Sequence, residues 1–327
     1  MSPGNTSSSA GLGYGGAIAT EDVQQITITN SQFTNNSVEA TVAAYGGAII
    51  NLGADLKITN TDFINNSATS GDEALGGAIY IGSSEIGNGK LTLIADGKDI
   101  LFSGNKANSV SNAIYAEDDT TVNLNAENDS SIIFNDGISS GNSILNINNS
   151  VNHLPSSGNI LVNADMSEFF GDINLYGGTL KIGEKGTFFN NAHSFSTNDG
   201  ATIDFQNGKI DNAQINEFSI SGTTNIKIDA DLKENAIDNF NVTSSTSNGT
   251  LNIEDVNILT LLDSDGTISK SIINAPVNLT VSSDAQTILT QNNRFDINVN
   301  GTDLTIAQKA FNGGIVSAVV FNETNDR

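Results

Sequence analysis

The motif Gly-Gly-Ala-Ile occurs three times near the start of this 327-residue chain, and Asn-Ala-Ile is a weaker fourth copy. The four copies are Gly15–Ile18, Gly46–Ile49, Gly76–Ile79 and Asn112–Ile114. A second motif, Phe-x-x-Asn, alternates with the first and spans Phe33–Asn36, Phe63–Asn66 and Phe102–Asn105. Successive motif isoleucines are 31, 30 and 35 residues apart. Two motifs that alternate at one period indicate a stacked array of similar units, and this constrains the fold more than any other feature.

Each unit contains short segments that are typical of β-strands. Ile26–Asn36 aligns with Leu56–Asn66 position for position without a gap, and the two are identical at six of 11 positions. Apolar residues alternate with polar ones at the start of both segments. This period of two puts one side of a strand inward, and no helical stripe with a period of 3.6 accompanies it. Three strand candidates per unit, at the Gly-Ala-Ile, Ile-Thr-Ile and Phe segments, predict an all-β parallel β-helix whose coils pair at ~4.8 Å.

The motif residues are expected to serve this stacking. Paired glycines permit a tight corner with positive φ and a close approach of neighbouring coils, and they are Gly15, Gly16, Gly46, Gly47, Gly76 and Gly77. We expect an aliphatic stack, an aromatic stack and a corner ladder of asparagines. Their respective members are Ile18, Ile49, Ile79 and Ile114; Phe33, Phe63 and Phe102; and Asn36, Asn66 and Asn105. All these roles are structural.

The motifs fade beyond residue 115, whereas strand-like alternation and turn dipeptides continue. We therefore predict a motif-bearing β-helix over residues 1–115 and its continuation, with degenerate coils, over residues 116–327. The third unit carries about nine extra residues around Ile86–Lys98. The apolar stretch Leu304–Phe321 is interpreted as a C-terminal cap or as a coil at which a longer protein was cut.

Composition excludes several classes of function. The chain has 37 acidic and 13 basic residues, for a net charge of −24, which disfavours nucleic acid and anionic membranes as partners. It has no cysteine and no apolar stretch near the ~20 residues that span a bilayer, so we expect no disulfide, thiolate metal site or membrane insertion. Met1–Asn5 has no signal-peptide features, and we favour a secreted protein whose signal peptide is absent here over a cytosolic one.

The alternation of Gly-Gly-Ala-Ile with Phe-x-x-Asn resembles the repeat signature of the chlamydial polymorphic membrane proteins and related bacterial autotransporter passengers. The match covers about residues 13–115, and the remainder is similar only in its composition, which is rich in Asn, Thr, Ser and Gly and poor in Arg. The resemblance implies a right-handed β-helix at the surface of a Gram-negative cell, often adhesive. It also implies a C-terminal outer-membrane β-barrel translocator, which we expect as a partner because this sequence has no such region.

Two segments share their letters with catalytic motifs. Gly11–Gly16 matches Gly-x-Gly-x-x-Gly of dinucleotide-binding proteins, but it is not flanked by a predicted strand and helix. Gly137–Gly141 matches the Gly-x-Ser-x-Gly nucleophile elbow, but its flanks favour turns, and His153 and His193 are the available bases. We interpret both matches as accidental and expect neither an active site nor a cofactor.

The sequence also gives little indication of a metal site or of a catalytic pair of carboxylates. Asp263–Gly266 resembles part of a calcium loop without its spacing, and Glu117–Asp119 is expected to be a solvated loop. The main alternative function is a β-helical polysaccharide lyase or hydrolase, which would draw on four carboxylates: Asp165, Glu168, Asp172 and Glu184. Arg294 is the one arginine before the C-terminal residue, so an acidic glycan is disfavoured.

We therefore expect a non-enzymatic secreted or surface passenger that binds a host-cell receptor or glycan, or associates with itself. A phage-type or purely structural fibre is a further alternative. Ser83–Lys98 is the candidate binding protrusion, because repeat arrays tolerate insertions in loops and loops often carry function; a disordered decoration is the other interpretation.

Overall fold

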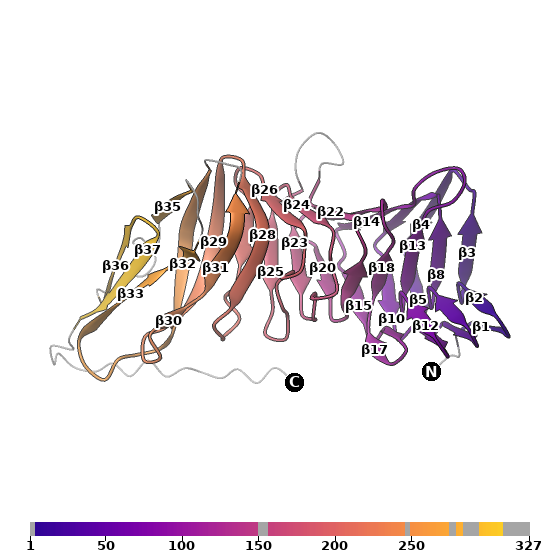
Figure 1. The fold of residues 1–327 in the computed structure, drawn as a ribbon, viewed down its shortest axis with the longest axis horizontal. Helices are drawn as coiled ribbons and strands as arrows, with labels where there is room; N and C mark the ends of the chain where they lie inside the picture. Colours follow the sequence, from indigo (N-terminus) through magenta and orange to yellow (C-terminus); the bar gives the residue numbers. More distant parts are fainter. Residues whose placement is uncertain (1–3, 150–155, 246–248, 275–278, 284–293, 310–327) are drawn as a thin grey trace.

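The computed structural model describes residues 4–149, 156–245, 249–274, 279–283 and 294–309. The described residues form β-strands joined by turns and contain no α-helix. Most strands pair in parallel, side by side along the long axis of the molecule (Figure 1). This confirms the prediction of an all-β chain with parallel strands in stacked sheets.

Two long parallel sheets run through most of the molecule. Sheet 1 consists of β4 (Gln25–Thr29), β9 (Asp55–Thr59), β14 (Lys90–Asp96), β19 (Thr121–Glu127), β22 (Ile144–Ile147), β24 (Asp172–Leu175), β26 (Ser194–Thr197), β28 (Asn212–Ile220), β31 (Asn239–Ser245) and β34 (Ile273–Asn274). Sheet 2 consists of β5 (Gln32–Thr34), β10 (Asp62–Ile64), β15 (Ile100–Ser103), β20 (Ser131–Phe134), β23 (Asn159–Val162), β25 (Thr179–Ile182), β27 (Thr202–Asp204), β29 (Thr223–Asp231), β32 (Thr250–Thr260) and β35 (Thr280–Ser283), and β30 (Ala236–Ile237) pairs with β29. The chain visits the two sheets in turn, so each repeat adds one strand to both.

Three further sheets belong to the N-terminal repeats. Sheet 3 consists of β3 (Ile18–Glu21), β8 (Ile49–Leu52), β13 (Ile79–Gly82), β18 (Ile114–Ala116) and β21 (Ile138–Ser140). Two short sheets form what we call the arm: β2 (Leu12–Tyr14), β7 (Ala43–Tyr45) and β12 (Glu73–Leu75) in one, and β1 (Thr6–Ser9), β6 (Ser37–Ala40), β11 (Ser67–Ser70), β16 (Lys106–Ala107) and β17 (Val110–Ser111) in the other.

The expectation of about three strands per repeat undercounts these repeats, since the first two contain five strands each. The three expected strands are present in sheets 1, 2 and 3, and the arm supplies the other two. Arm strands such as Ser37–Ala40 and Ala43–Tyr45 are short and rich in small residues. They lack alternating large apolar residues, so the sequence pattern gave no signal for them.

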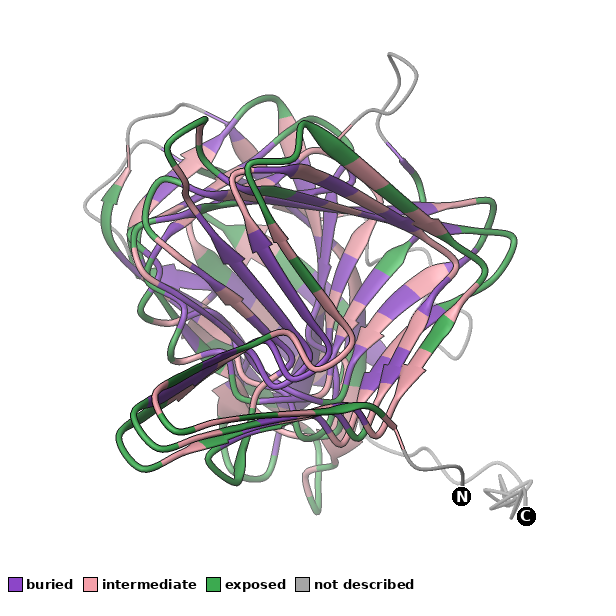
Figure 2. Ribbon diagram, turned by 90° about the vertical axis from the view of Figure 1, so that its right-hand side faces the viewer, coloured by how far each residue is buried: buried purple, intermediate pink, exposed green. Residues whose placement is uncertain are grey.

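The motif isoleucines and phenylalanines lie in the interior. Ile18, Ile49, Ile79 and Ile114 are successive register partners in sheet 3. The rings of Phe33, Phe63 and Phe102 stack with centroids 5.1 and 4.9 Å apart, and Phe134 extends the stack at 4.8 Å. Figure 2 shows how buried residues line the inside of the successive strands. Parallel in-register pairing therefore places equal positions of the repeat on top of one another.

The motif asparagines form a buried hydrogen-bonded ladder. The Nδ2 of Asn36 donates to the Oδ1 of Asn66 at 2.9 Å, and the Nδ2 of Asn66 donates to the Oδ1 of Asn105 at 2.9 Å. Asn105 donates in turn to the Oδ2 of Asp136 at 2.7 Å. Each of these side chains is at most 5% exposed. Because a buried amide is costly without partners, the ladder fixes the corner of the chain at this position.

The two glycines of each pair have different tasks. Gly46 has a φ of +65°, which lies in the left-handed region that favours glycine. Gly47 has no such φ, but a Cβ at this position would lie 2.1 Å from the carbonyl oxygen of Gly77 in the next repeat. The same division holds for the other two pairs, namely Gly15 with Gly16 and Gly76 with Gly77. The first glycine makes the corner, and the second allows the close approach of neighbouring repeats.

The extra residues of the third unit do not form one protrusion, which corrects the expectation for Ser83–Lys98. Lys90–Asp96 is β14, a central strand of sheet 1 that pairs with both β9 and β19. The strand register shows two separate insertions. Before β14, Ile79 and Lys90 are 11 residues apart, whereas their partners Ile49 and Asp55 in the preceding repeat are 6 apart. After β14, the third unit has four more residues than the second before it reaches Phe102, the partner of Phe63. Leu91 and Leu93 match the buried Leu56 and Ile58, so the alternation continues through the segment.

Sheets 1 and 2 continue in pairing across residue 116, and the proposed division into residues 1–115 and 116–327 remains a prediction. The arrangement changes near the C-terminal end of the described chain. There β33 (Gly266–Ser271), β37 (Asp303–Gln308) and β36 (Phe295–Asn300) form an antiparallel sheet. Of the expected cap over Leu304–Phe321, residues 304–309 are described, five of them in β37, and the rest lies outside the described residues.

Candidate binding groove

A row of four tyrosines follows the corner between the arm and sheet 3. Tyr14 and Tyr45 are register partners on β2 and β7, and their rings stack with centroids 5.9 Å apart. Tyr80 and Tyr115 are register partners on β13 and β18, with a centroid distance of 5.5 Å. Tyr45 and Tyr80 join the two halves across the corner at 4.9 Å. These four residues are the tyrosine row.

Strand alternation explains why the tyrosines point away from the hydrophobic core, although Tyr80 is only 4% exposed and Tyr14 is 42% exposed. Each lies next to the repeat motif: Tyr14 and Tyr45 precede a Gly-Gly pair, and Tyr80 and Tyr115 follow a buried isoleucine. In β13 and β18 the isoleucine points into the core, so the following residue points to the opposite face. On β2, a Cβ on Gly13 would lie 2.6 Å from Val38 of the arm, so Gly13 faces the arm interior and its neighbours Leu12 and Tyr14 face the other side of the strand.

Two glutamates hold tyrosine hydroxyl groups in the row. The Oη of Tyr45 donates to the Oε2 of Glu73 at 2.8 Å, and the Oη of Tyr80 donates to Glu117. The backbone N–H of Ser83 also donates to Glu117, at 3.1 Å. Burial, and then the hydrogen bond to Glu73, raises the pKa of Tyr45 to about 12. Burial and Glu117 likewise raise the pKa of Tyr80, so these phenols stay neutral at physiological pH.

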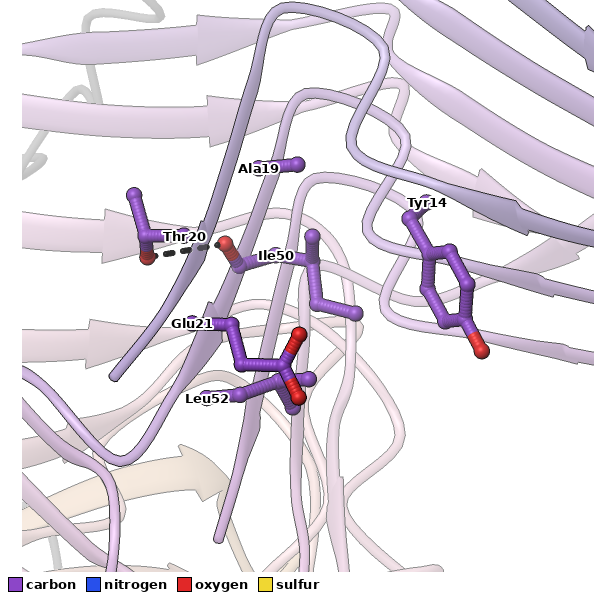
Figure 3. A pocket seen from close by; sticks show the side chains of 6 residues that line it. All are labelled: Tyr14, Ala19, Thr20, Glu21, Ile50 and Leu52. Atoms are coloured by element: carbon purple, nitrogen blue, oxygen red, sulfur yellow. Dashed lines mark hydrogen bonds between the residues drawn. The ribbon is translucent and has the colours of Figure 1, made fainter. Parts of the chain in front are cut away.

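A pocket of ≈260 Å³ opens at the N-terminal end of the row. We call it the Tyr14 pocket, and its lining residues are Tyr14, Ala19, Thr20, Glu21, Ile50 and Leu52 (Figure 3). Ala19, Ile50, Tyr80 and Tyr115 are successive register partners, so the first repeat has a methyl group where later repeats have larger side chains. This small side chain leaves the space between the Tyr14 ring and Ile50.

The pocket has apolar walls and three polar side-chain groups, namely the hydroxyls of Tyr14 and Thr20 and the carboxylate of Glu21. Tyr14 is 42% exposed, and Leu12 beside it on β2 is 47% exposed, which makes this corner an exposed apolar surface. The Thr20 hydroxyl proton is already used, because the Oδ1 of Asn51 at 3.0 Å and the backbone oxygen of Ile50 at 3.3 Å are its acceptors. The Glu21 carboxylate has no hydrogen-bond or ion-pair partner among the described residues. No lysine, arginine or histidine is among the residues that line the pocket.

The structure places the catalytic-motif look-alikes in ordinary strands and corners. Gly13 of the Gly11–Gly16 segment lies in β2, and a Cβ on Gly16 would lie 2.2 Å from the carbonyl oxygen of Gly47, so this segment serves the stacking of repeats. Ser139 of the Gly137–Gly141 segment is buried in β21, where its Oγ accepts a hydrogen bond from Asn112 at 2.5 Å. His193 instead contacts Asp172, and His153 lies outside the described residues.

Two of the four carboxylates considered for an enzyme, Asp165 and Asp172, have local hydrogen-bond partners. The backbone N–H of Ser167 and the Thr187 hydroxyl lower the pKa of Asp165. Burial opposes ionisation of Asp172, but hydrogen bonds from Ser194 and His193 lower its pKa overall. No hydrogen bond joins any two of Asp165, Glu168, Asp172 and Glu184 within the described ranges.

The acidic segments considered for metal binding serve local structure instead. Glu117 and Asp118 hold Tyr80 and the backbone N–H of Asn142 respectively, and Asp119 has a positive φ in a turn. Asp263–Gly266 leads into β33, and the carbonyl oxygen of Ser264 accepts a hydrogen bond from Gln308. Arg294 lies over the ring of Phe295 at 5.8 Å. Within the described part of the chain, no group of three or more His, Cys, Asp or Glu side chains could hold a metal ion.

Comparison with family models, with curated proteins and with solved structures finds no match for this chain. The described residues include no helix of the length and apolarity needed to cross a membrane. The tyrosine row was missed from the sequence, although a signal was present. Four of the five tyrosines in the chain lie immediately beside a copy of the repeat motif, at the repeat period.

Proposed function

We propose that this chain is a single-stranded parallel β-helix, right-handed as in the autotransporter passengers that its motifs resemble. The support is the pairing pattern: the chain passes through sheets 1 and 2 in turn, and each strand pairs in parallel with its counterpart in the next repeat. Such a scaffold presents an extended surface and places corner residues of many repeats in rows.

We infer that the function is binding, and that the protein is a secreted or surface-exposed passenger of adhesin type. The observation that carries this proposal is the exposed Tyr14 at the end of the tyrosine row, together with the Tyr14 pocket beside it. Tyrosine supplies a large, rigid contact area with a polar tip, and such side chains dominate the energy of many interfaces. An apolar pocket with few polar groups is the usual form of a binding site. A host-cell surface component is the proposed partner, and a translocator would deliver the chain to the cell surface.

The test is binding of the purified chain to cultured epithelial cells and to a glycan array, with Tyr14→Ser as the variant. Because Tyr14 is 42% exposed, its replacement should leave the fold intact and reduce binding about tenfold, as loss of an aromatic anchor does. Tyr176→Ser is the matched control, since Tyr176 lies outside the tyrosine row. Equal binding by the parent chain and both variants would exclude the tyrosine row, and no binding by the parent chain would contradict an adhesin.

A further inference from the structure

We propose that the Tyr14 pocket accepts a lysine or arginine side chain from a basic segment of a partner protein. The inference rests on the binding function proposed above and assigns the chemistry of its ligand. It starts from the mixture of groups that line the pocket. Tyr14, Ile50 and Leu52 supply aromatic and aliphatic walls, and Glu21 supplies one carboxylate.

The negative charge of Glu21 favours a ligand with a positive charge. Figure 3 shows the Glu21 carboxylate beside Leu52, on the side of the pocket that faces Tyr14. Glu21 is exposed, and a neutral ligand would gain no electrostatic attraction from its carboxylate. An anionic ligand would be repelled. A cationic end group would meet Glu21, which has no other partner in the described chain, and could also contact the face of the Tyr14 ring.

The shape of the pocket selects the remainder of the ligand. The lining side chains offer three polar groups, namely the Tyr14 and Thr20 hydroxyls and the Glu21 carboxylate, and the Thr20 proton is already donated within the chain. The pocket therefore suits a ligand with one polar end better than a ligand rich in hydrogen-bonding groups, such as a sugar. Lysine and arginine carry an apolar stem and a charged tip, and they cover apolar surface with the stem while the tip stays polar. The stem fits the wall of Ala19, Ile50 and Leu52, and the tip fits Glu21.

The tyrosine row beyond the pocket extends this preference to a polypeptide segment. Beyond the pocket, Glu73 and Glu117 lie along the tyrosine row, where each holds one tyrosine hydroxyl and keeps further acceptor capacity. The whole chain carries a net charge of −24, which attracts basic partners and accelerates their association. A partner segment with several basic residues would therefore meet carboxylates at the pocket and along the row.

The test is fluorescence anisotropy with a labelled, end-blocked octapeptide of alternating lysine and serine, at about physiological ionic strength. The matched probe is the same peptide with every lysine acetylated, which removes the charge and keeps the stem. We expect saturable binding of the lysine peptide and at least tenfold weaker binding of the acetylated one. Equal binding of the two peptides would overturn the proposal.

Two variants place the site. Ala19→Tyr fills the pocket with the residue that stands at this register position in the third and fourth repeats, and Glu21→Gln removes its charge at nearly constant shape. Each should weaken binding of the lysine peptide at least tenfold, whereas Glu39→Gln, an exposed control on β6, should leave it unchanged. Equal losses from Glu21→Gln and Glu39→Gln would show diffuse attraction only. Thermal melting checks that each variant is folded. If Ala19→Tyr does not fold, the comparison of Glu21→Gln with Glu39→Gln still tests the site.

The outcome separates this inference from the proposed function. If the parent chain binds cells in a Tyr14-dependent manner but does not bind the lysine peptide, the ligand chemistry is wrong and the binding function stands. If the peptide binds in the Tyr14 pocket but cells do not, the pocket chemistry is correct and the proposed adhesion is wrong.

Discussion

At the scale of single residues, the asparagine ladder joins neighbouring repeats through buried hydrogen bonds. Asn66 is fully buried, its Oδ1 accepts from both the backbone N–H and the Nδ2 of Asn36, and its Nδ2 donates to Phe33 and Asn105. Every polar atom of this side chain is therefore satisfied by a different repeat from its own. Removal of the amide would leave partners on both sides unpaired in the interior.

We therefore expect Asn66→Ala to lower the free energy of unfolding by about 2–4 kcal/mol, since it orphans more than one buried group at about 1–3 kcal/mol each. Chemical denaturation monitored by far-UV circular dichroism measures the change. Asn88→Ala is the control, because Asn88 is exposed and accepts a single hydrogen bond from Ser83. A loss no larger than that of the control would mean that the ladder contributes nothing to stability.

At the scale of elements, the spacing between strands of sheet 3 depends on glycine at the second motif position. A methyl group on Gly47 would collide with the backbone oxygen of Gly77. The two glycines are this close because the strands that follow them, β8 and β13, pair with each other in register. Backbone cannot move aside as a flexible side chain could. The close approach of repeats is therefore a requirement on the sequence that hydrophobic pattern alone does not express.

Gly47→Ala should lower the free energy of unfolding by about 1–3 kcal/mol, as overpacking does. Gly11→Ala provides the matched control, because a Cβ there meets no atom within 4 Å and its φ is not in the left-handed region. Thermal melting of both variants tests the prediction. Similar melting temperatures would show that neighbouring repeats can separate at this corner without cost.

At the scale of the whole molecule, the stability of the long sheets should depend on pH through Asp238. This side chain is 1% exposed and accepts hydrogen bonds from the backbone N–H groups of Asp211 and Asp229. Burial raises its pKa to about 8, against the opposing effect of those hydrogen bonds, and the charges of Asp229 and Asp211 add to the rise. The folded chain therefore favours the protonated form of this carboxyl group.

The sign of the effect follows from linkage. A pKa that is higher in the folded state than its unfolded value of 3.8 stabilises the fold fully below that value and loses this contribution as pH rises to about 8. We expect the free energy of unfolding to fall across this window, and Asp238→Asn to flatten the fall. Denaturation at pH 4, 6 and 8 compares the two proteins, and parallel curves would mean that Asp238 does not cause the dependence.

The sequence by itself determined the repeat and most of its consequences. Equal motif spacing predicts parallel stacking, and parallel in-register pairing then brings like residues together, so the stacks at Ile49 and Phe63 and the ladder at Asn66 follow from local pattern. Three features became clear only in the tertiary structure: the two short sheets of the arm, the division of the third unit's extra residues into two insertions, and the contact between the rings of Tyr45 and Tyr80 across a corner. The physical reason is that these features depend on angles and contacts between sheets. Period and alternation describe what one strand buries, and they do not determine which outward faces turn toward each other.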